Sequence, residues 1–353
     1  MKKLTLSVAF LAAFAALMTI TTTAQAADTV KVFVLAGQSN MEGKADNKLL
    51  LHQATDAKTK DLFKHLRDGD EWIVRDDAFI KFLGRSGPLT IGYGSPGKTG
   101  PELEFGLAMA NKFDEPVILI KAAWGGHSLY QKFRSPSAGL PSDEILKEEL
   151  AKAQERTKND NERHNRNNPL PTMEEIKAGY GVSYRAMMAE VKDVQENYET
   201  MFPTLAGKKL EFAGFVWFQG FNDQFGDYAP GQYESNMKHF IKDVRKDLGA
   251  PNMPFVIAAL GTNGFNEPQG GGLAVSSAQL AMNDVPEFKG NVIAFRTDVL
   301  CDKVAWEAYP TWRDNFEAWQ KVGSDRPYHY LGSAIWYGRI GKKMGESMVE
   351  LLK

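Results

Sequence analysis

The chain has 353 residues, 24% of them charged, and its formal net charge at pH 7 is −2. This balance excludes a strongly basic surface of the kind that binds nucleic acids. The single cysteine, Cys301, excludes an intramolecular disulfide, so the fold must depend on its hydrophobic core. The length fits one large α/β domain, or at most two small ones.

The first 26 residues have the three parts of a secretory signal peptide. Residues 1–3 are Met-Lys-Lys, residues 4–20 are apolar, and residues 24–26 form an Ala-Gln-Ala cleavage site. The apolar run is short and no stop-transfer pattern follows it, which argues against a membrane anchor. We therefore expect residues 27–353 to be the mature protein, secreted or periplasmic and free of the membrane.

Five apolar runs predict a parallel β-sheet. They are continuous runs rather than alternations, so both faces of each strand should be buried. Helical patterns between them predict a three-layer α/β/α sandwich with a mainly parallel five-stranded sheet. The predicted strands are residues 30–36, 116–122, 212–218, 255–260 and 291–295, and the predicted helices are residues 102–113, 233–248, 273–282 and 332–352.

The first strand leads directly into a serine. Residues 30–43 read VKVFVLAGQSNMEG, so only Gly37 and Gln38 separate the predicted strand from Ser39. Gly37 removes the side chain that would crowd the turn, and it permits a positive φ. Because α/β proteins place their chemistry at the carboxyl ends of parallel strands, we expect the Ser39 hydroxyl at this edge of the sheet.

Residues 92–99, GYGSPGKT, fit the phosphate-binding pattern G-x-x-x-x-G-K-[ST]. That loop requires a strand before it and a helix that begins at the lysine. Residues 84–90 are not the hydrophobic strand that such a loop needs, and Gly100-Pro101 delays the helix to Glu102. We therefore expect this segment to border a cleft rather than bind a nucleotide, with Glu102 either stabilising the helix N-terminus or hydrogen-bonding near the site.

Three later segments bring polar groups to the same edge of the sheet. Gly125 and Gly126 follow the second strand, and their exposed N–H groups suit an oxyanion hole. Gln219 and Asn222 follow the third strand and add amide donors. His329 lies just before the last helix, where it can reach the rim and deprotonate the serine. A nucleophile, a base and oxyanion donors are what acyl transfer needs.

Two further features carry open alternatives. Residues 141–200 are dense in Glu, Lys, Asn and Arg, and predict a charged helical insertion that is either a solvated cap or a lid over the substrate. His127 either shapes an acyl or sugar pocket or is simply exposed. No two histidines have metal-ligand spacing, so we expect no metal site.

The motifs, in this order, resemble the SGNH hydrolase superfamily. They are GQSNM at 37–41, the glycine pair at 125–126, GFND at 220–223 and the late His329. GQSNM and WFQG at 217–220 are similar to the sialate O-acetylesterase and acetylxylan esterase branch (carbohydrate esterase family 6). The resemblance implies a single flavodoxin-like domain over most of the mature chain, which removes O-acetyl groups from carbohydrates without a metal or other cofactor.

The resemblance also assigns roles. It makes Ser39 the nucleophile and His329 the base. The oxyanion hole would comprise the N–H of Ser39, the N–H of Gly125 or Gly126, and the Asn222 side chain. The branch often has Glu after the glycine of the third motif, where this chain has Phe221, and we expect Gln219 to take part of that polar role.

The fourth motif departs from the superfamily pattern, which is Asp-x-x-His. Arg326 stands three residues before His329, and Asp325 stands four before it. On a loop, four residues can still bring a carboxylate to imidazole Nδ1, where it would fix the tautomer and orientation of the ring. The alternative is a Ser–His dyad, with a backbone carbonyl as the third group.

The sequence therefore predicts a serine esterase that acts on an acetylated carbohydrate, either a polysaccharide or sialic acid. The alternative is a catalytically silent carbohydrate-binding protein on the same scaffold, which only the altered fourth motif supports. The sugar and the oligomeric state stay open.

Overall fold

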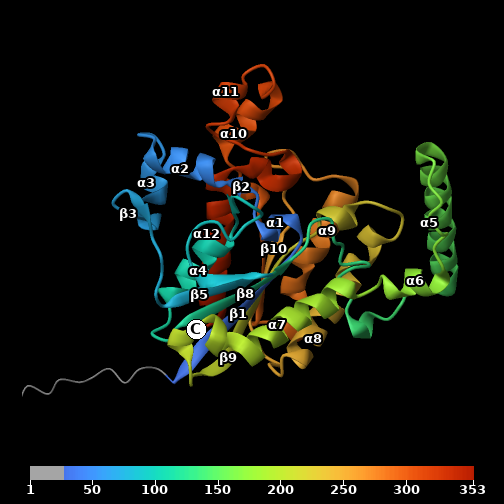
Figure 1. Cartoon of the computed structure of the whole chain (residues 1–353), viewed down its shortest axis with the longest axis horizontal. Coiled ribbons are helices and arrows are strands. Elements are labelled where there is room, and N and C mark those ends of the chain that lie inside the picture. The colour runs from blue at the N-terminus through green and yellow to red at the C-terminus, as the bar shows by residue number, and fades with distance from the viewer. Residues whose placement is uncertain (1–27) are drawn as a thin grey trace, which may run out of the picture.

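The computed structural model describes residues 28–353 and is an α/β/α sandwich built on a seven-stranded sheet (Figure 1). The strand order is β11-β10-β9-β1-β8-β5-β6, and every neighbouring pair is parallel except β5 and β6. The predicted fold class is confirmed. The predicted signal peptide lies outside the described residues. The strands are β1 Thr29–Gly37, β5 Ala78–Phe82, β6 Arg85–Pro88, β8 Val117–Ala123, β9 Lys209–Phe218, β10 Phe255–Ala259 and β11 Val292–Arg296.

The expected count of five strands is wrong, because β5 and β6 extend the sheet beyond β8. Both come from the stretch after the serine motif, whose apolar runs are too short to stand out. All five residues of β5 are buried, and they include Lys81. The Lys81 ammonium pairs with Glu190 and Asp193, which lie on a helix across the sheet face. A charged residue in the middle of a buried strand hides that strand from a hydrophobicity pattern.

Side chains of β1 alternate between two separate hydrophobic clusters, one on each face of the sheet. Phe33 and Leu35 pack with α4 and α12, whereas Val32 and Val34 pack with α7 and α8. Full burial of such side chains stabilises a fold by about 1.5–3 kcal/mol each. Both faces are therefore covered, as the continuous apolar runs predicted. These helices are α4 Glu102–Ala110, α7 Val182–Met201, α8 Ala229–Asp247 and α12 Ala334–Leu351.

The four predicted helices are present, with ends that differ by up to four residues. The α8 helix begins at Ala229 because Pro230 occupies its first turn, where a missing N–H costs nothing. The α12 helix begins after Ser333, whose hydroxyl accepts a hydrogen bond from the Trp336 N–H at 3.2 Å. The other helices are α1 Ser39–Glu42, α2 Asn47–Thr55, α3 Lys60–Phe63, α5 Asp143–His164, α6 Met173–Ala178, α9 Gly270–Leu280, α10 Lys303–Ala308 and α11 Phe316–Trp319, and the short strands are β2 Ala45–Asp46, β3 Arg67–Asp68, β4 Glu71–Trp72 and β7 Lys98–Thr99.

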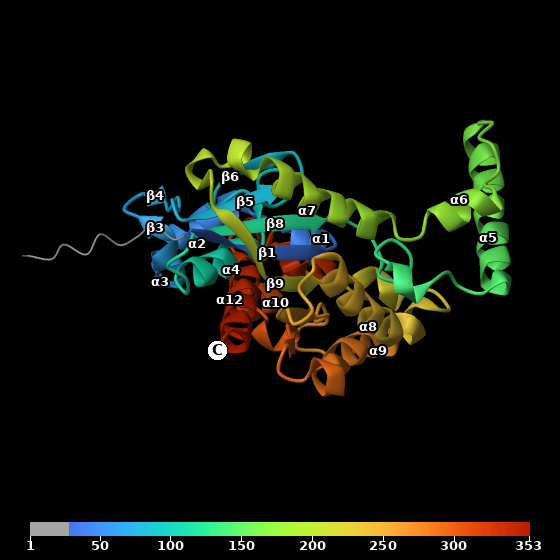
Figure 2. The ribbon, with the colours of Figure 1, turned by 90° about the horizontal axis from the view of Figure 1, so that it is seen from below.

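The charged segment 141–200 divides into two parts. Helices α5 and α6 project from the body of the molecule (Figures 1 and 2), and Leu146 is the one buried residue of α5. Helix α7 differs, because Met187, Val191 and Val194 are buried against the sheet. It is the crossover helix between β8 and β9, so only the first part of the segment is an exposed insertion. Within residues 28–353 no helix has the length and apolar character needed to cross a membrane.

Candidate active site

The turn that carries Ser39 is fixed by close backbone packing. Ser39 opens α1 immediately after β1 and is 7% exposed. A Cβ on Gly37 would lie closer than 3.0 Å to the Phe218 carbonyl oxygen, and a Cβ on Gly43 would lie equally close to the Gly100 backbone. Gly37 has a φ of 158°, close to extended, so approach to the neighbouring strand, rather than a left-handed turn, requires glycine here.

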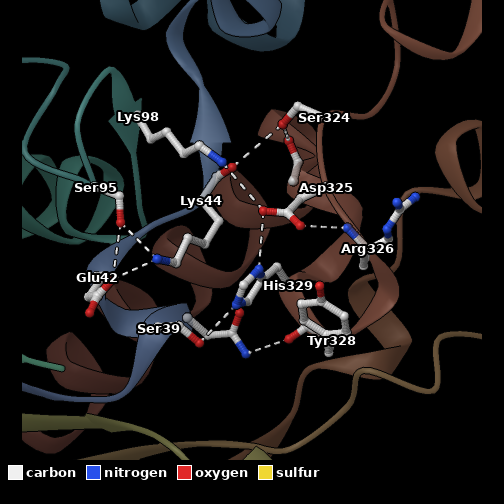
Figure 3. Close-up of polar contacts among 12 residues, drawn as sticks. Ser39, Glu42, Lys44, Ser95, Lys98, Ser324, Asp325, Arg326, Tyr328 and His329 are labelled. Carbon is white, nitrogen blue, oxygen red and sulfur yellow. Dashed lines mark hydrogen bonds and ion pairs between the residues drawn. The ribbon is translucent and has the colours of Figure 1, made fainter. Parts of the chain in front are cut away.

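Ser39, His329 and Asp325 lie in a row at the carboxyl edge of the sheet (Figure 3). The His329 Nε2 is 3.0 Å from the Ser39 Oγ, and the His329 Nδ1 is 3.1 Å from the Asp325 Oδ2. The carboxylate oxygen lies off the Nδ1–H direction, so this is a close polar contact rather than an aligned hydrogen bond. The spacing of four residues thus brings the carboxylate to the imidazole.

Asp325 is surrounded by groups that favour its charged form. Partial burial raises the pKa of its carboxyl. The contact with His329, the N–H of Arg326 at 2.8 Å and the nearby Lys98 ammonium lower this pKa by more than burial raises it. The net effect lowers the pKa of Asp325 to about 2. The group is therefore an anion at neutral pH, able to stabilise a positive charge on the imidazole.

The loop that carries Asp325 and His329 has an unusual backbone. Tyr330 and Leu331 have φ values of 50° and 59°, a left-handed conformation that costs about 1–2 kcal/mol per non-glycine residue. Both side chains are fully buried, and the Leu331 carbonyl accepts hydrogen bonds from the N–H groups of Ser324 and Asp325. Burial and these bonds offset the strain, and the bonds hold Ser324 and Asp325 against the turn that follows His329.

Asn40 joins this loop to the serine turn. Its Nδ2 donates to the Tyr328 carbonyl at 3.1 Å, and its Oδ1 accepts from the Tyr337 hydroxyl at 2.9 Å. One buried amide thus sets the position of the residue before His329 relative to the residue after Ser39. Sequence reasoning missed this role of Asn40. The one available signal was the position of Asn40 within the GQSNM motif.

Gln38 orients Asn222. The Gln38 Nε2 donates to the Asn222 Oδ1 at 3.0 Å, and the Gln38 Oε1 accepts from the Asn222 backbone N–H at 3.2 Å. With its oxygen engaged, Asn222 has only its Nδ2 to offer, and that atom has no acceptor among the described residues. A Cβ on Gly126 would lie 4.0 Å from this Nδ2, so Asn222 is a neighbour of the loop that carries Gly125 and Gly126, hereafter the glycine loop.

Gln219 lies beneath the site rather than in it. Its Nε2 is within hydrogen-bond reach of Asp223 at 2.6 Å, the His127 carbonyl at 3.0 Å and Gln38 at 3.1 Å, and its Oε1 accepts from the Tyr233 hydroxyl. Two amide protons already face three acceptors, so none is left for an oxyanion. The expectation that Gln219 lines the oxyanion hole is wrong, because the amide belongs to a buried network.

The two glycines after β8 differ in what their N–H groups contact. The Gly125 N–H donates to the Glu42 carboxylate at 2.5 Å, although a Cβ on Gly125 would lie only 3.8 Å from the Ser39 Cβ. The Gly126 N–H has no acceptor among the described residues. Of the two predicted donors, the structure therefore leaves the one from Gly126 available.

Asp223 anchors the chain just beyond the glycines. Its fully buried carboxylate accepts hydrogen bonds from the N–H groups of Leu129 and Tyr130 at 2.9 and 2.7 Å and from Gln219. Burial raises the pKa of Asp223 to about 6, although the three donors act in the opposite direction. The GFND motif thus supplies Asn222 beside the glycine loop and Asp223 beneath it, where the carboxylate holds the chain after the glycines.

Aromatic side chains lie next to His329 and next to the glycine loop. The Tyr328 ring lies 4.6 Å from the His329 ring and 5.7 Å from the Phe221 ring, measured between centroids, and Tyr328 is substantially exposed. On the other side, His127 stacks on Trp124 and is neither fully exposed nor fully buried. Its pKa is lowered by partial burial and by nearby Lys132.

The segment 92–99 packs against the site but does not have the geometry of a phosphate-binding loop. Lys98 lies in β7, four residues before α4 begins, and its ammonium is 3.4 Å from the Asp325 carboxylate. Glu102 pairs with Lys121 at 2.8 Å in the fully buried interior, and the same ammonium donates to the Glu42 carbonyl. Within residues 28–353 no group of three or more His, Cys, Asp or Glu side chains is arranged to hold a metal ion.

Comparison with family models decides the family. Residues 29–164 and 172–295 match the model described as "Carbohydrate esterase, sialic acid-specific acetylesterase". The chain belongs to this family. Family membership makes it a carbohydrate esterase, and hence a hydrolase whose substrate class is acetylated carbohydrate. The matched residues include the serine turn, the glycine loop and Asn222, and they end before the loop that carries Asp325 and His329.

No curated protein matches the chain. Among solved structures, a protein from Arabidopsis thaliana is 17% identical with a TM-score of 0.45, and the match covers 82% of this chain and 93% of that one. The carbohydrate acetylesterase XAC1771 from Xanthomonas citri is 14% identical (TM-score 0.41; 77% of this chain, 51% of that one), and NanS is 12% identical (TM-score 0.40; 77% and 79%). At these values the family assignment depends on the family model.

Proposed function

We propose that this chain is a serine esterase that removes O-acetyl groups from carbohydrates through an acetyl-enzyme on Ser39. The observation that carries the proposal is the 3.0 Å contact between Ser39 Oγ and His329 Nε2 in a member of a carbohydrate esterase family. A hydroxyl at this distance from an imidazole can lose its proton to the ring as it attacks a carbonyl carbon. We also propose that residues 27–353 act as one domain, secreted or periplasmic after loss of the signal peptide.

In the first half of the reaction, Ser39 Oγ forms a bond to the acetyl carbon while His329 takes its proton. The tetrahedral intermediate collapses, the bond to the sugar oxygen breaks, and His329 returns the proton to that oxygen. In the second half, His329 deprotonates a water molecule that attacks the acetyl-enzyme, and acetate leaves as Ser39 recovers its proton.

Three donors are positioned to hold the negative oxygen of the tetrahedral intermediate: the N–H of Ser39, the N–H of Gly126 and the Nδ2 of Asn222. The Ser39 N–H opens a helix and so has no intrahelical acceptor. Donors fixed in advance stabilise charge that develops in the transition state, and removal of one such donor typically costs about 10²–10³ in kcat.

Asp325 would complete a triad by holding the protonated His329. Its lowered pKa supports this role, since the carboxylate stays charged throughout the reaction. The close contact of Asp325 with His329 weakens the one argument for a silent carbohydrate-binding protein, which was the altered spacing of the fourth motif.

Acetate release tests the proposal. We expect the protein to release acetate from p-nitrophenyl acetate and from at least one member of a panel that includes acetylated xylan and O-acetylated sialic acid. Ser39→Ala should remove this activity, and the exposed Ser86→Ala should retain it as a matched control. Equal rates for wild type and Ser39→Ala would refute the esterase mechanism, and the preferred glycan in the panel would identify the sugar.

A further inference from the structure

The Glu42 carboxylate contacts three groups from different segments: a backbone N–H of the glycine loop, the Lys44 ammonium and the Ser95 hydroxyl. Figure 3 shows the contacts with Lys44 and Ser95. Its Oε1 accepts the Gly125 N–H at 2.5 Å. Its Oε2 accepts from the Lys44 ammonium at 2.6 Å and from the Ser95 hydroxyl at 3.0 Å. Glu42 lies on α1, three residues after Ser39, so the helix that presents the nucleophile also holds the glycine loop.

The glycine loop needs such a contact. Two consecutive glycines have more backbone freedom than any other pair of residues, and Gly126 adopts a φ of 77°. On one side of the pair, the Trp124 N–H bonds to the Gly37 carbonyl at 3.2 Å. On the other side, Asp223 holds the chain from residue 129 onward. Between these anchors, Glu42 holds the one N–H of the pair that has an acceptor among the described residues.

The charge of Glu42 is neutralised where it lies. Burial raises the pKa of its carboxyl, but Lys44, Ser95 and the Gly125 N–H together lower it by more than burial raises it. The group is therefore an anion with a pKa below its ordinary value. The Lys44 ammonium also reaches the Ser95 hydroxyl at 2.8 Å. An unpaired anion beside an oxyanion hole would repel the developing negative charge, and Lys44 removes that penalty.

We propose that Glu42 is a positioning residue for the oxyanion hole. By binding the Gly125 N–H, it fixes the Gly125–Gly126 segment so that the next N–H, from Gly126, points at the oxyanion. Lys44 balances its charge. This inference rests on the proposed esterase function and deepens it, because it explains how a flexible glycine pair becomes a fixed donor.

The proposal predicts that variants of Glu42 lose transition-state stabilisation and keep their affinity for the substrate. Glu42→Ala should lower kcat for p-nitrophenyl acetate about 100-fold with little change in KM, because the oxyanion donor loses its fixed direction while the substrate still binds. Methylboronic acid, which forms a tetrahedral adduct with an active serine, should bind more weakly by a similar factor. Glu42→Gln retains an oxygen acceptor for Gly125 and should stay within about tenfold of wild type.

A second set of variants tests the charge balance, and it applies even where Glu42→Ala fails to fold. Lys44→Met should lower kcat about tenfold, because it leaves the Glu42 charge unbalanced beside the oxyanion. Combining Lys44→Met with Glu42→Gln should restore kcat to the level of Glu42→Gln alone. The exposed Ser86→Ala, which lies outside this cluster, is the control and should stay close to wild type.

The outcomes separate this inference from the proposed function. An unchanged kcat in Glu42→Ala, a rise in KM in place of the fall in kcat, or additive losses in the Lys44→Met/Glu42→Gln double variant would each overturn the role of Glu42 and leave the esterase intact. Activity that survives Ser39→Ala would instead overturn the esterase mechanism itself.

Discussion

The turn that carries Ser39 and the loop that carries His329 face each other across the site, but different contacts hold them. The serine turn takes its shape from neighbouring backbone, which approaches Gly37 and Gly43 so closely that a Cβ at either position would collide with it. The histidine loop takes its shape from buried side chains, since Tyr330 and Leu331 are held in left-handed conformations. A short motif is enough to encode the first, whereas the second depends on the packed core.

The carboxylates on the two sides of the site differ in burial and in the charge of their neighbours. Asp223, behind the glycine loop, is fully buried among neutral donors, and its pKa is raised to about 6. Asp325, beside His329, also lies near Lys98, and its pKa is lowered to about 2. Both accept backbone N–H groups, so the difference arises from the cationic neighbours of Asp325 and the complete burial of Asp223. One carboxylate is suited to support structure and the other to support a charged histidine.

The strongest test disrupts the histidine side. Asp325→Asn should lower kcat by about 10²–10⁴ with little change in KM, because the imidazolium loses its counter-charge and the ring can adopt the wrong tautomer. The measurement is steady-state hydrolysis of p-nitrophenyl acetate, with Lys98→Met as a control that removes a charge near Asp325 but leaves its contact with His329. A loss of less than threefold in Asp325→Asn would instead favour a Ser–His dyad.

The next largest effects are expected on stability, with one variant in the serine turn and one in the histidine loop. Gly37→Ala should lower the free energy of unfolding by about 3 kcal/mol, because its Cβ would collide with the Phe218 carbonyl and push two central strands apart. Tyr330→Phe should cost about 1–3 kcal/mol, because it leaves the Gly261 N–H without the hydroxyl that accepts it at 3.1 Å.

Urea unfolding at neutral pH measures both variants. Gly231 is an exposed glycine of α8 at which an added Cβ would meet no atom within 4 Å, so Gly231→Ala is a matched control that should be close to neutral. Similar stability for Gly37→Ala and Gly231→Ala would show that the serine turn is not constrained by strand contact.

The weakest effect is a pH dependence. Folding raises the pKa of Asp223 from its ordinary 3.8 to about 6, so between these values the folded protein binds more protons than the unfolded chain. The contribution of this group to the free energy of unfolding is therefore fully present only below the unfolded pKa and is lost as the pH rises through about 6. Between pH 4 and pH 6 it falls by about 2 kcal/mol. Asp223→Asn should remove this component.

The measurement is the change in unfolding free energy between pH 4 and pH 6, compared for wild type and Asp223→Asn. Asp325 acts in the opposite sense, because its lowered pKa produces a contribution that is present above about pH 4 and is lost as the pH falls toward 2. The two groups thus titrate in separate windows. Identical slopes for wild type and Asp223→Asn between pH 4 and pH 6 would contradict the raised pKa.

Local sequence signals predicted much of the fold. Continuous apolar runs identified β1, β8, β9, β10 and β11, because a strand buried on both faces has few polar residues. The same rule missed β5, where the buried Lys81 interrupts the run. It also placed α7 in the charged insertion, because the exposed face of that helix is as charged as α5 and its buried stripe is narrow.

Within the site, sequence reasoning selected Ser39, His329 and Asn222 as neighbours at one edge of the sheet. It misassigned Gln219, because the sequence does not show whether an amide points to the edge of the sheet or into the core. It also assigned no role to Glu42, since a glutamate one turn after the serine acquires meaning only when the glycine loop from another strand lies against it.

Hydrophobic pattern and residue type along short stretches were enough to establish which strands form the centre of the sheet. They also established that a serine, glycines, an asparagine and a histidine would meet at its carboxyl edge. Packing between distant segments decided which atoms face each other. It brought the Asp325 carboxylate to the His329 imidazole, and it paired the Gly125 N–H with Glu42, which leaves the Gly126 N–H without an acceptor among the described residues. Hydrogen-bond directions of this kind depend on contacts between residues far apart in the chain, and no local pattern records them.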